Sequence, residues 1–258
     1  MINCVIIGTG NMAEALLKSV KTTDIEIVGI YGKSIAKSEA LSLKYAVNSF
    51  TALNEIPTHV DLYLLCVSDN AIAEVATQLN IGASLAVHFS GIKQLEELGT
   101  VKNKAVFWPI ESVNKNSFTD FTNTPVCIEA NTDENYRIIE AFADRLSKKV
   151  LHKSSIERQY LHLAATISNN FSNHLLALTK QILDEQNIDY KLLQHLVSNG
   201  INNAFNFDPA LIQTGAAVRN DTETIHTHKM LLHQNIDLIA LYELMSKSIF
   251  DLKQRQHA

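Results

Sequence analysis

Residues 2–13 read INCVIIGTGNMA, a short apolar run followed by the pattern Gly-x-Gly-x-x-Ala. Gly8 permits a tight turn after a strand, and Gly10 removes a side chain where a pyrophosphate must approach the backbone. The free N–H groups and the dipole at the head of the following helix attract an anion. The alternative is a turn that only packs, in a Rossmann-type domain that has lost its ligand. The pattern favours a dinucleotide site formed by Gly8, Thr9, Gly10, Asn11 and Met12.

Strand-like and helix-like segments alternate from the N-terminus to about residue 153. Residues 60–67, VDLYLLCV, are nearly all apolar, as expected of a central strand covered on both faces. The alternation predicts a doubly wound α/β domain with a mostly parallel, Rossmann-type sheet over residues 1–153. Further strands are expected at 2–7, 25–31, 46–50, 84–89, 105–108, 125–130 and 149–152, and helices at 12–20, 35–43, 71–79, 93–98 and 133–146.

Helical periodicity dominates after residue 153. Ser154 and Glu157 match the capping box Ser-x-x-Glu, which marks the start of a helix. Breaks are expected near Asn187, within residues 198–203, and at later Asp-Pro and Gly positions (208–209 and 215). The sequence therefore predicts an all-α domain over residues 154–258.

The composition limits the kind of partner. A net charge of −5 with no basic stripe disfavours nucleic acid. No apolar run is long enough to span a bilayer, and the first residues lack the basic region of a signal peptide. Cys4, Cys66 and Cys127 lie in apolar, strand-like contexts without paired spacing, which indicates reduced thiols. We expect a cytoplasmic protein that binds neither nucleic acid nor a membrane.

The end of the second expected strand discriminates between cofactors. An acidic residue there would bind the ribose 2′-hydroxyl of NAD, whereas a cation would bind the 2′-phosphate of NADP. The sequence reads Tyr31-Gly32-Lys33-Ser34, without an acid. Lys33 offers charge and Ser34 a hydroxyl, although a solvated loop lysine is the alternative. We therefore expect NADP, with NAD less favoured.

Polar residues also follow the later strands, and ligands of open α/β sheets bind at the carboxyl ends of strands. We expect the nicotinamide and its ribose against Val67, Ser68 and Asp69 and against Ser90. Ser68 and Asp69 have the alternative of capping the next helix. A third strand end of this kind follows at residues 108–112, and His88, in the second, is either catalytic or a histidine satisfied within the strand layer.

A neutral polar stripe marks the first long helix of the second half. From Gln159 to Thr179 the chain has no Asp, Glu, Lys or Arg, although an exposed helix normally carries charge. The polar side chains are spaced mostly three or four apart, so they share one face. The stripe indicates burial against a cleft or another subunit, or else an uncharged surface; its members are His162, Thr166, Asn169, Asn170 and Asn173.

A second feature of this half is the segment around Arg219, which leads into a helix capped by Asn220 or Asp221. A helix N-terminus beside an arginine suits a carboxylate or phosphate, and a structural pair of Arg219 with Asp221 is the alternative. Histidines follow at 226, 228 and 233, but spacings of two and five do not place zinc ligands on one helix face. We therefore expect no metal site.

The opening residues 7–13 resemble those of pyrroline-carboxylate reductases and related NADP-dependent oxidoreductases. The whole chain resembles an uncharacterised family that joins such a reductase-type domain to a C-terminal helical domain of unknown function. The resemblance rests on residues 88–91, on 162–171, and on 214–228. It implies an NADP-dependent oxidoreductase and a homodimer assembled through the helical domain.

The chain departs from these families at three positions. Trp108-Pro109 stands where the family often has His-Pro, and Asn220 stands where it often has glycine. Related β-hydroxyacid dehydrogenases have a catalytic lysine four residues before an asparagine, where this chain has Thr166 or Ala165. The last departure argues against a lysine-assisted hydroxyacid dehydrogenase and leaves the proton donor open.

Together these observations predict an NADP-dependent oxidoreductase that acts on a small, anionic keto or imino compound. Arg219 would bind the anion, His162 or His88 would donate the proton, and Asn170 would orient the reacting group. The rival hypothesis is a dinucleotide-binding sensor or interaction protein without catalysis. A Rossmann domain for another nucleotide, such as a sugar nucleotide, is a third.

Overall fold

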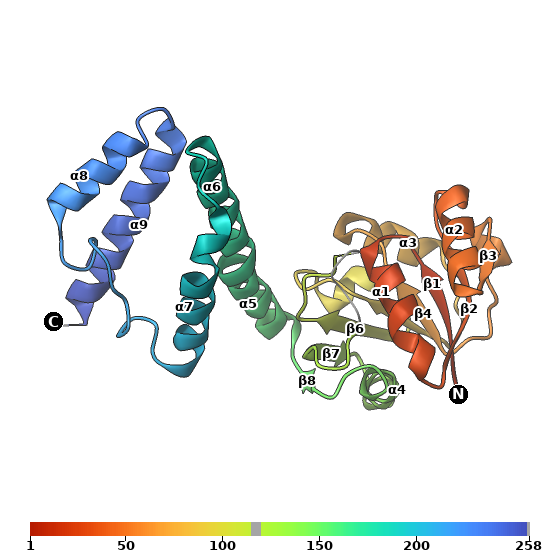
Figure 1. Ribbon diagram of the computed structural model, residues 1–258. Helices are drawn as coiled ribbons and strands as arrows, with labels where there is room; N and C mark the ends of the chain where they lie inside the picture. The colour runs from red at the N-terminus through yellow and green to blue at the C-terminus, as the bar shows by residue number, and fades with distance from the viewer. Residues whose placement is uncertain (115–119, 257–258) are drawn as a thin grey trace. The chain divides into compact units, whose positions relative to one another are not determined.

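The computed structural model describes residues 1–114 and 120–256 (Figure 1). Its contacts divide the chain into two compact units, unit 1 (Met1–His174) and unit 2 (Leu175–Ala258). Unit 1 contains the sheet, and unit 2 is helical. The predicted boundary between residues 153 and 154 separates two domains, whereas the two units are defined by contacts between residues. The predicted domain boundary therefore stays a prediction.

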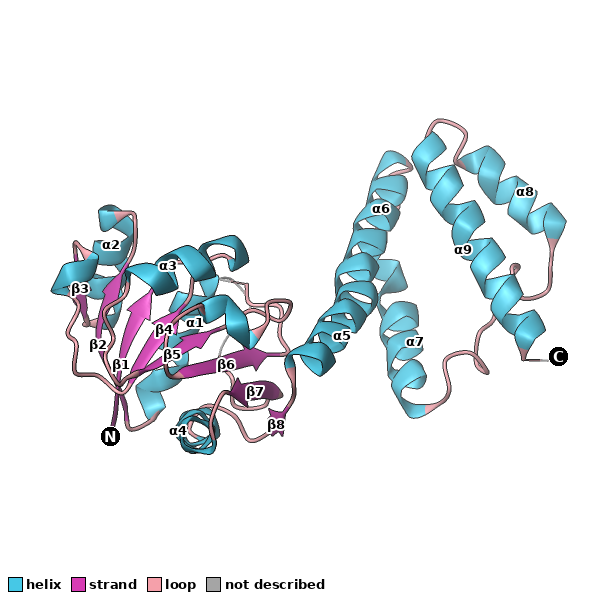
Figure 2. Ribbon diagram, turned by 180° about the vertical axis from the view of Figure 1, so that it is seen from behind, coloured by secondary structure: helices cyan, strands magenta, loops and turns pink. Residues whose placement is uncertain are grey.

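Unit 1 is built on an eight-stranded sheet (Figure 2). The strand order is β3-β2-β1-β4-β5-β6-β7-β8, and every neighbouring pair is parallel except β6 with β7. The predicted doubly wound, mostly parallel Rossmann-type sheet is therefore confirmed. The strands are β1 (Ile2–Ile7), β2 (Ile25–Tyr31), β3 (Asn48–Phe50), β4 (Leu62–Leu65), β5 (Leu85–His88), β6 (Lys104–Pro109), β7 (Val126–Ala130) and β8 (Val150–His152).

Helices cover both faces of this sheet. Successive β1 side chains enter two core clusters, because side chains alternate across a strand. Ile6 packs in the cluster that contains residues of α1 and α4, and Val5 packs in the cluster that contains residues of α3. The helices of unit 1 are α1 (Asn11–Ser19), α2 (Ile35–Tyr45), α3 (Ile72–Gln78), α4 (Asp133–Asp144) and α5 (Ser155–Ala165), with short 3₁₀ turns η1 (Val20–Thr22), η2 (Leu53–Glu55), η3 (Asp69–Ala71) and η4 (Leu95–Leu98).

The helix that opens at the predicted capping box is not uniform. Ser154 accepts the N–H of Glu157, which confirms the box. α5 then passes into a π-helical turn, η5 (Thr166–Phe171), and continues as α6 (Ser172–Glu185), which crosses from unit 1 into unit 2. A π turn carries an extra residue per turn, so it shifts the phase of the side chains that follow, and such turns are frequent at functional sites.

Unit 2 continues with η6 (Tyr190–Leu193), α7 (Gln194–Asn206), α8 (Thr222–Leu231) and α9 (Ile236–Arg255). The break expected within residues 198–203 is wrong, because α7 runs through Gly200; one glycine costs a helix only about 1 kcal/mol. The other expected breaks are confirmed, with Asn187 and Gly215 at positive φ. No described residue from 175 to 256 is buried, so unit 2 has no core of its own within this chain.

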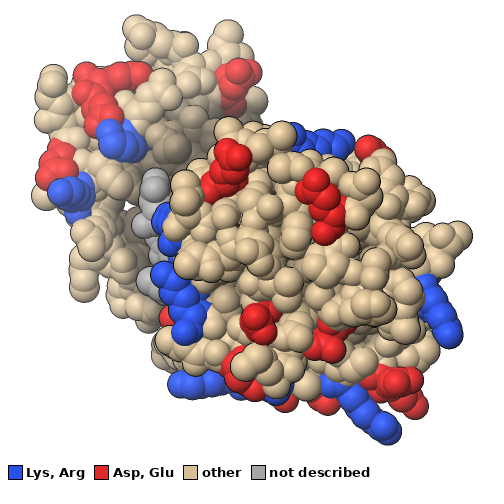
Figure 3. Space-filling view, turned by 90° about the vertical axis from the view of Figure 1, so that its right-hand side faces the viewer, with Lys and Arg blue, Asp and Glu red and all other residues tan. Residues whose placement is uncertain are grey.

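No helix among residues 1–114 and 120–256 is both long and apolar enough for a membrane span. On the face shown in Figure 3, lysine and arginine side chains are interspersed with aspartate and glutamate.

Candidate functional site

The glycine turn follows β1 directly and leads into α1. Gly8 has φ +122°, and a Cβ there would lie 2.1 Å from the carbonyl oxygen of Cys66. A Cβ at Gly10 would meet no atom of the described residues within 4 Å. The two glycines therefore have different roles. Gly8 lets β1 approach the end of β4, whereas Gly10 leaves open space before the N-terminus of α1.

The head of α1 is left available to a ligand. Gly10 is the N-cap residue and makes no side-chain capping hydrogen bond. The Asn11 side chain turns aside and donates Nδ2–H to the carbonyl oxygen of Val113, at 3.2 Å, in the loop after β6. Thr9 packs against Gly32, where an added Cβ would lie 2.5 Å from its methyl carbon. N–H groups without capping side chains are a typical anion site.

Lys33 and Ser34 lie where β2 leads into α2. Ser34 is the N-cap residue of α2, and its hydroxyl makes no capping hydrogen bond. Lys33 Nζ lies 3.4 Å from Glu74 Oε1 of α3, and both side chains are exposed. Pairs of this kind contribute about 0–1 kcal/mol, so Lys33 is available to a stronger anion.

The ends of β4 and β5 hold the other residues expected at the cofactor. Val67 and Asp69 are half-buried and Ser68 is exposed. The Ser68 side chain makes no capping hydrogen bond, which disfavours the alternative of a simple helix cap. Ser90 is buried, and its Oγ accepts the N–H groups of Ile92 and Lys93 at 3.3 and 3.0 Å. These bonds hold the loop after β5, and the predicted helix at 93–98 is reduced to the turn η4.

His88 is fully buried in β5. Its Nδ1 accepts the Ser90 N–H at 3.2 Å, so Nε2 carries the proton and donates it to the Gln94 carbonyl, also at 3.2 Å. Burial lowers the pKa of His88 to about 3, and the nearby positive charge of Arg158 acts in the same direction. His88 is therefore neutral near pH 7 with both nitrogens engaged, which favours the structural interpretation over the catalytic one.

Arg158 connects α5 to the sheet, and the sequence did not single it out. Its side chain is buried and lies 2.6 Å from Glu129 Oε2 on β7. It also donates to the carbonyl oxygens of Ser90 and Lys93, at 3.2 and 2.5 Å, and to Ser155 Oγ. The sequence feature that could have indicated this role is an arginine in the first turn after a capping box, immediately before a stretch without charged residues. Arg158 fixes the loop after β5 against α5.

The contact between α5 and the loop after β5 brings Trp108 and His162 together. Their ring centroids are 5.8 Å apart, at an interplanar angle of 48°. Gly91 lies between them: a Cβ there would come within 2.6 Å of both His162 Cδ2 and Trp108 Cε2. Position 91 requires a glycine because its backbone lies close to both rings. The sequence alone does not show this requirement.

Two adjoining cavities of about 420 and 380 Å³ open beside these rings, at the carboxyl end of β6. The predicted polar stripe faces them, and Glu111 joins it from the loop after β6. We call the two together the β6 cavity; its lining is Trp108, Ile110, Glu111, Ser112, Asn114, His162, Ala165, Thr166, Ser168, Asn169, Asn170 and Asn173. Of the predicted catalytic residues, the structure thus brings together His162 and Asn170.

Arg219 belongs to unit 2, in the turn before α8. Its Nη2 lies 3.8 Å from Asp221 Oδ2, a loose pair with the arginine exposed. Asp221 caps α8 by accepting the Thr224 N–H. Asn220 has φ +53°, a left-handed conformation that glycine also adopts, which accounts for asparagine in the place of the family's glycine. The role of Arg219 stays a prediction.

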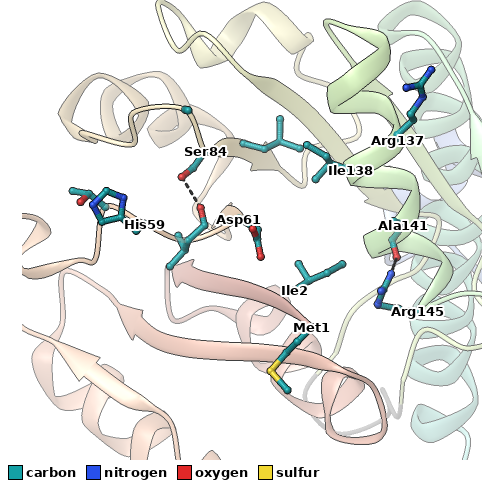
Figure 4. A pocket seen from close by; sticks show the side chains of 13 residues that line it. Met1, Ile2, His59, Asp61, Ser84, Arg137, Ile138, Ala141 and Arg145 are labelled. Carbon is teal, nitrogen blue, oxygen red and sulfur yellow. Dashed lines mark hydrogen bonds between the residues drawn. The ribbon is translucent and has the colours of Figure 1, made fainter.

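A further cavity of about 630 Å³ lies at the opposite, amino end of the strands (Figure 4). Asp61 lies within it and accepts the Asn3 N–H at 2.8 Å, while Arg145 pairs with Asp24 at 2.6 Å. Ligands of open α/β sheets bind at the carboxyl ends of strands, so this cavity is separate from the candidate site. Within the described residues, no three His, Cys, Asp or Glu side chains are grouped to hold a metal ion.

Two family models match the chain. Residues 3–88 match the family described as NADP oxidoreductase coenzyme F420-dependent, and residues 124–249 match a domain of unknown function, DUF2520. A comparison with curated proteins finds no match.

Solved structures match over nearly the whole chain. A Bacteroides fragilis protein provisionally designated NADP oxidoreductase BF3122 is 30% identical, with 97% of this chain and 98% of that chain covered and a TM-score of 0.89. A 1-pyrroline-5-carboxylate reductase from Streptococcus pyogenes is 17% identical, with 98% of each chain covered and a TM-score of 0.64. A reductive aminase from Aspergillus terreus, in complex with NADPH and ethyl levulinate, is 11% identical, with 99% of each chain covered and a TM-score of 0.69.

The pyrroline-5-carboxylate reductase and the reductive aminase, at identities of 17% and 11%, show only that the fold is shared. The Bacteroides fragilis relative and the paired family matches show more. This chain belongs to the NADP oxidoreductase family in which an N-terminal Rossmann-like domain is joined to a C-terminal DUF2520 domain.

Proposed function

We propose that this protein is an NADPH-dependent reductase that transfers hydride to a small keto or imino compound bound in the β6 cavity. The observation that carries the proposal is the continuity of two sites. The loop after β6 supplies Glu111 and Ser112 to the cavity, and Val113 in the same loop accepts the hydrogen bond from Asn11 at the head of α1. A dinucleotide with its pyrophosphate at α1 would extend along the carboxyl ends of β4 and β5 toward this cavity.

The cofactor chemistry is hydride transfer, and the chain's own residues bind and orient. His162 is the proton donor in this proposal, because the other candidate, His88, is neutral and fully engaged. Asn170 orients the reacting carbonyl or imine from the π turn. The prediction from the sequence that Arg219, in unit 2, binds an anionic group of the substrate is kept in the proposal and is tested by its alanine variant.

The test is turnover with a panel of keto acids, imino acids and aldehydes, followed by NADPH absorbance. For keto compounds, whose reduction needs a proton as the hydride arrives, His162→Ala should lower kcat by about 10²–10⁴-fold, the usual contribution of general acid catalysis, with NADPH affinity unchanged. Arg219→Ala should instead raise KM for anionic substrates. Unchanged turnover in the His162 variant would remove that residue from the mechanism, and NADPH binding without turnover of any compound would favour a nucleotide sensor.

NADP rather than NAD follows, in this proposal, from Lys33 and Ser34. A 2′-phosphate carries more charge than the Glu74 carboxylate, so it displaces Glu74 from Lys33. Lys33→Glu is expected to weaken NADPH binding by about tenfold or more and to leave NADH binding nearly unchanged or tighter. The measurement is titration of both reduced cofactors by energy transfer from Trp108, the only tryptophan.

Lys102→Glu is the matched control, because it makes the same charge change in the loop before β6, at the amino ends of the strands. An equal loss of NADPH affinity in both variants would mean that net charge, and not the 2′-phosphate contact, sets the preference.

A homodimer through the helical unit completes the proposal. Helices must bury an apolar face against another element, and no described residue of unit 2 is buried. Large apolar side chains are exposed instead, among them Leu192, Leu196, Phe205, Leu231 and Ile236. A second copy of this chain would cover them, and a monomer in sedimentation experiments would contradict the proposal.

A further inference from the structure

The charge of the β6 cavity is unlike that expected for an anionic ligand. Among the described residues that line it, Glu111 is the one acidic side chain and His162 the only other ionisable one. None of these described lining residues is a lysine or an arginine, and their remaining polar groups are amides and hydroxyls. The Glu111 carboxylate is therefore the one negative charge that the described lining residues place in the cavity.

Several carboxylates of unit 1 form ion pairs, and Glu111 forms none with the described residues. Glu129 is paired with Arg158, Glu14 with Lys44, and Glu74 with Lys33. The described residues place no lysine or arginine within 4 Å of Glu111, and its Oε1 accepts only the neighbouring Ser112 N–H, at 2.9 Å. The position of Glu111 also points to a ligand. It lies just beyond β6, at the carboxyl ends of the strands, where ligands of these sheets bind.

The lack of a strong proton donor is the second observation. Reduction of a ketone forms an alkoxide, which needs a proton as the hydride arrives. The positions expected for a catalytic lysine are Ala165 and Thr166, and the Thr166 hydroxyl donates to the His162 carbonyl at 3.0 Å. Among the described residues that line the cavity, His162 alone remains as an ionisable proton donor. Reduction of an iminium ion needs no proton at this step, because the nitrogen accepts the electron pair of the broken π bond.

We infer that the group reduced in the β6 cavity is a positively charged C=N group, an iminium ion or a protonated imine, whose nitrogen lies against the Glu111 carboxylate. The inference rests on the proposed function and names its substrate class. In the step, hydride leaves C4 of the dihydronicotinamide and forms a C–H bond at the iminium carbon. The C=N π pair becomes the nitrogen lone pair, and the products are NADP⁺ and an amine that takes a proton from water.

Glu111 acts on binding rather than on the chemical step. The positive charge that it attracts decreases as hydride arrives, so the carboxylate stabilises the bound substrate at least as much as the transition state. Its removal should therefore raise KM and leave kcat unchanged or slightly higher. This split separates a counter-charge from a general acid, whose loss would lower kcat.

The experiment compares two five-membered rings of similar size, N-methyl-1-pyrrolinium and cyclopentanone, with the full-length protein and saturating NADPH. The first carries a permanent charge, and the second has none. We expect the pyrrolinium to be reduced with the higher kcat/KM. Glu111→Gln should raise its KM about tenfold or more, in line with the loss of one charge-assisted contact, and Glu111→Asp should recover part of the loss. Glu26→Gln, an exposed carboxylate of β2 outside the cavity, makes the same charge change and should have no effect.

The outcomes separate the two proposals. Faster reduction of cyclopentanone, or a pyrrolinium KM that Glu111→Gln leaves unchanged, overturns the inference while the reductase function stands. Failure to bind NADPH overturns the proposed function. If neither ring is reduced, binding of N-methylpyrrolidinium to the NADP⁺ complex, read from Trp108 fluorescence, decides the inference: binding that Glu111→Gln weakens supports it, and its absence overturns it.

Discussion

Gly10→Val is expected to weaken NADPH binding by about a hundredfold or more while the free energy of unfolding changes by less than about 1 kcal/mol. A Cβ at position 10 would meet no atom of the described residues within 4 Å, so the fold has room for the added carbon. The same space lies in front of the uncapped N–H groups of α1. A branched side chain there removes two or three charge-assisted hydrogen bonds to a pyrophosphate, each contributing about 1.5–3 kcal/mol. Titration by energy transfer from Trp108 and urea unfolding give the two quantities.

Gly8→Ala is the matched comparison and should behave in the opposite way. At φ +122° an alanine is strained, and its Cβ would lie 2.1 Å from the Cys66 carbonyl oxygen. β1 and β4 would have to separate at the centre of the sheet, so a loss of folded protein is expected before any specific loss of cofactor. If Gly10→Val destabilised the protein as much as Gly8→Ala, the open space at Gly10 would have a structural and not a ligand-binding purpose.

The difference between these two glycines shows which features of the turn can be predicted from the sequence and which cannot. The spacing of Gly8, Gly10 and Ala13 predicts the turn, the strand and the helix, because these are local consequences of backbone conformation. It does not show that Gly8 is close to Cys66 while Gly10 faces open space. That distinction depends on the pairing of β1 with β4, which lies far along the chain.

The helical half shows the same limit. A stretch without charge from Gln159 to Thr179 predicts a face against a cleft or another subunit, or else an uncharged surface, and the stripe lines the β6 cavity. The π turn at Thr166–Phe171 could not be predicted, because its residues also suit an ordinary helix. Glu111 belongs to the strand end at residues 108–112, but it lines one cavity with the stripe only because α5 packs beside β6.

Arg158→Met is expected to lower the free energy of unfolding by about 3–5 kcal/mol, the cost of breaking a buried ion pair by removing one partner. The change leaves Glu129 without its counter-charge and removes the donors to the Ser90 and Lys93 carbonyls. Burial lowers the pKa of Arg158, while the Glu129 charge acts in the opposite direction. The arginine nevertheless stays charged at neutral pH. Urea unfolding followed by Trp108 fluorescence measures the loss.

The double variant Arg158→Met with Glu129→Leu tests whether the cost comes from the unpaired charge. Replacing both members of a buried pair by apolar residues is often neutral or stabilising, so the double variant should recover much of what the single variant loses. Additive losses would instead assign the effect to the carbonyl contacts. The double variant should still turn over substrate poorly, because the loop after β5 and its Gly91 would no longer be held against His162 on α5. We therefore expect stability and turnover to separate at Arg158: the ion pair with Glu129 should determine the free energy of unfolding, and the hydrogen bonds to the loop should determine turnover.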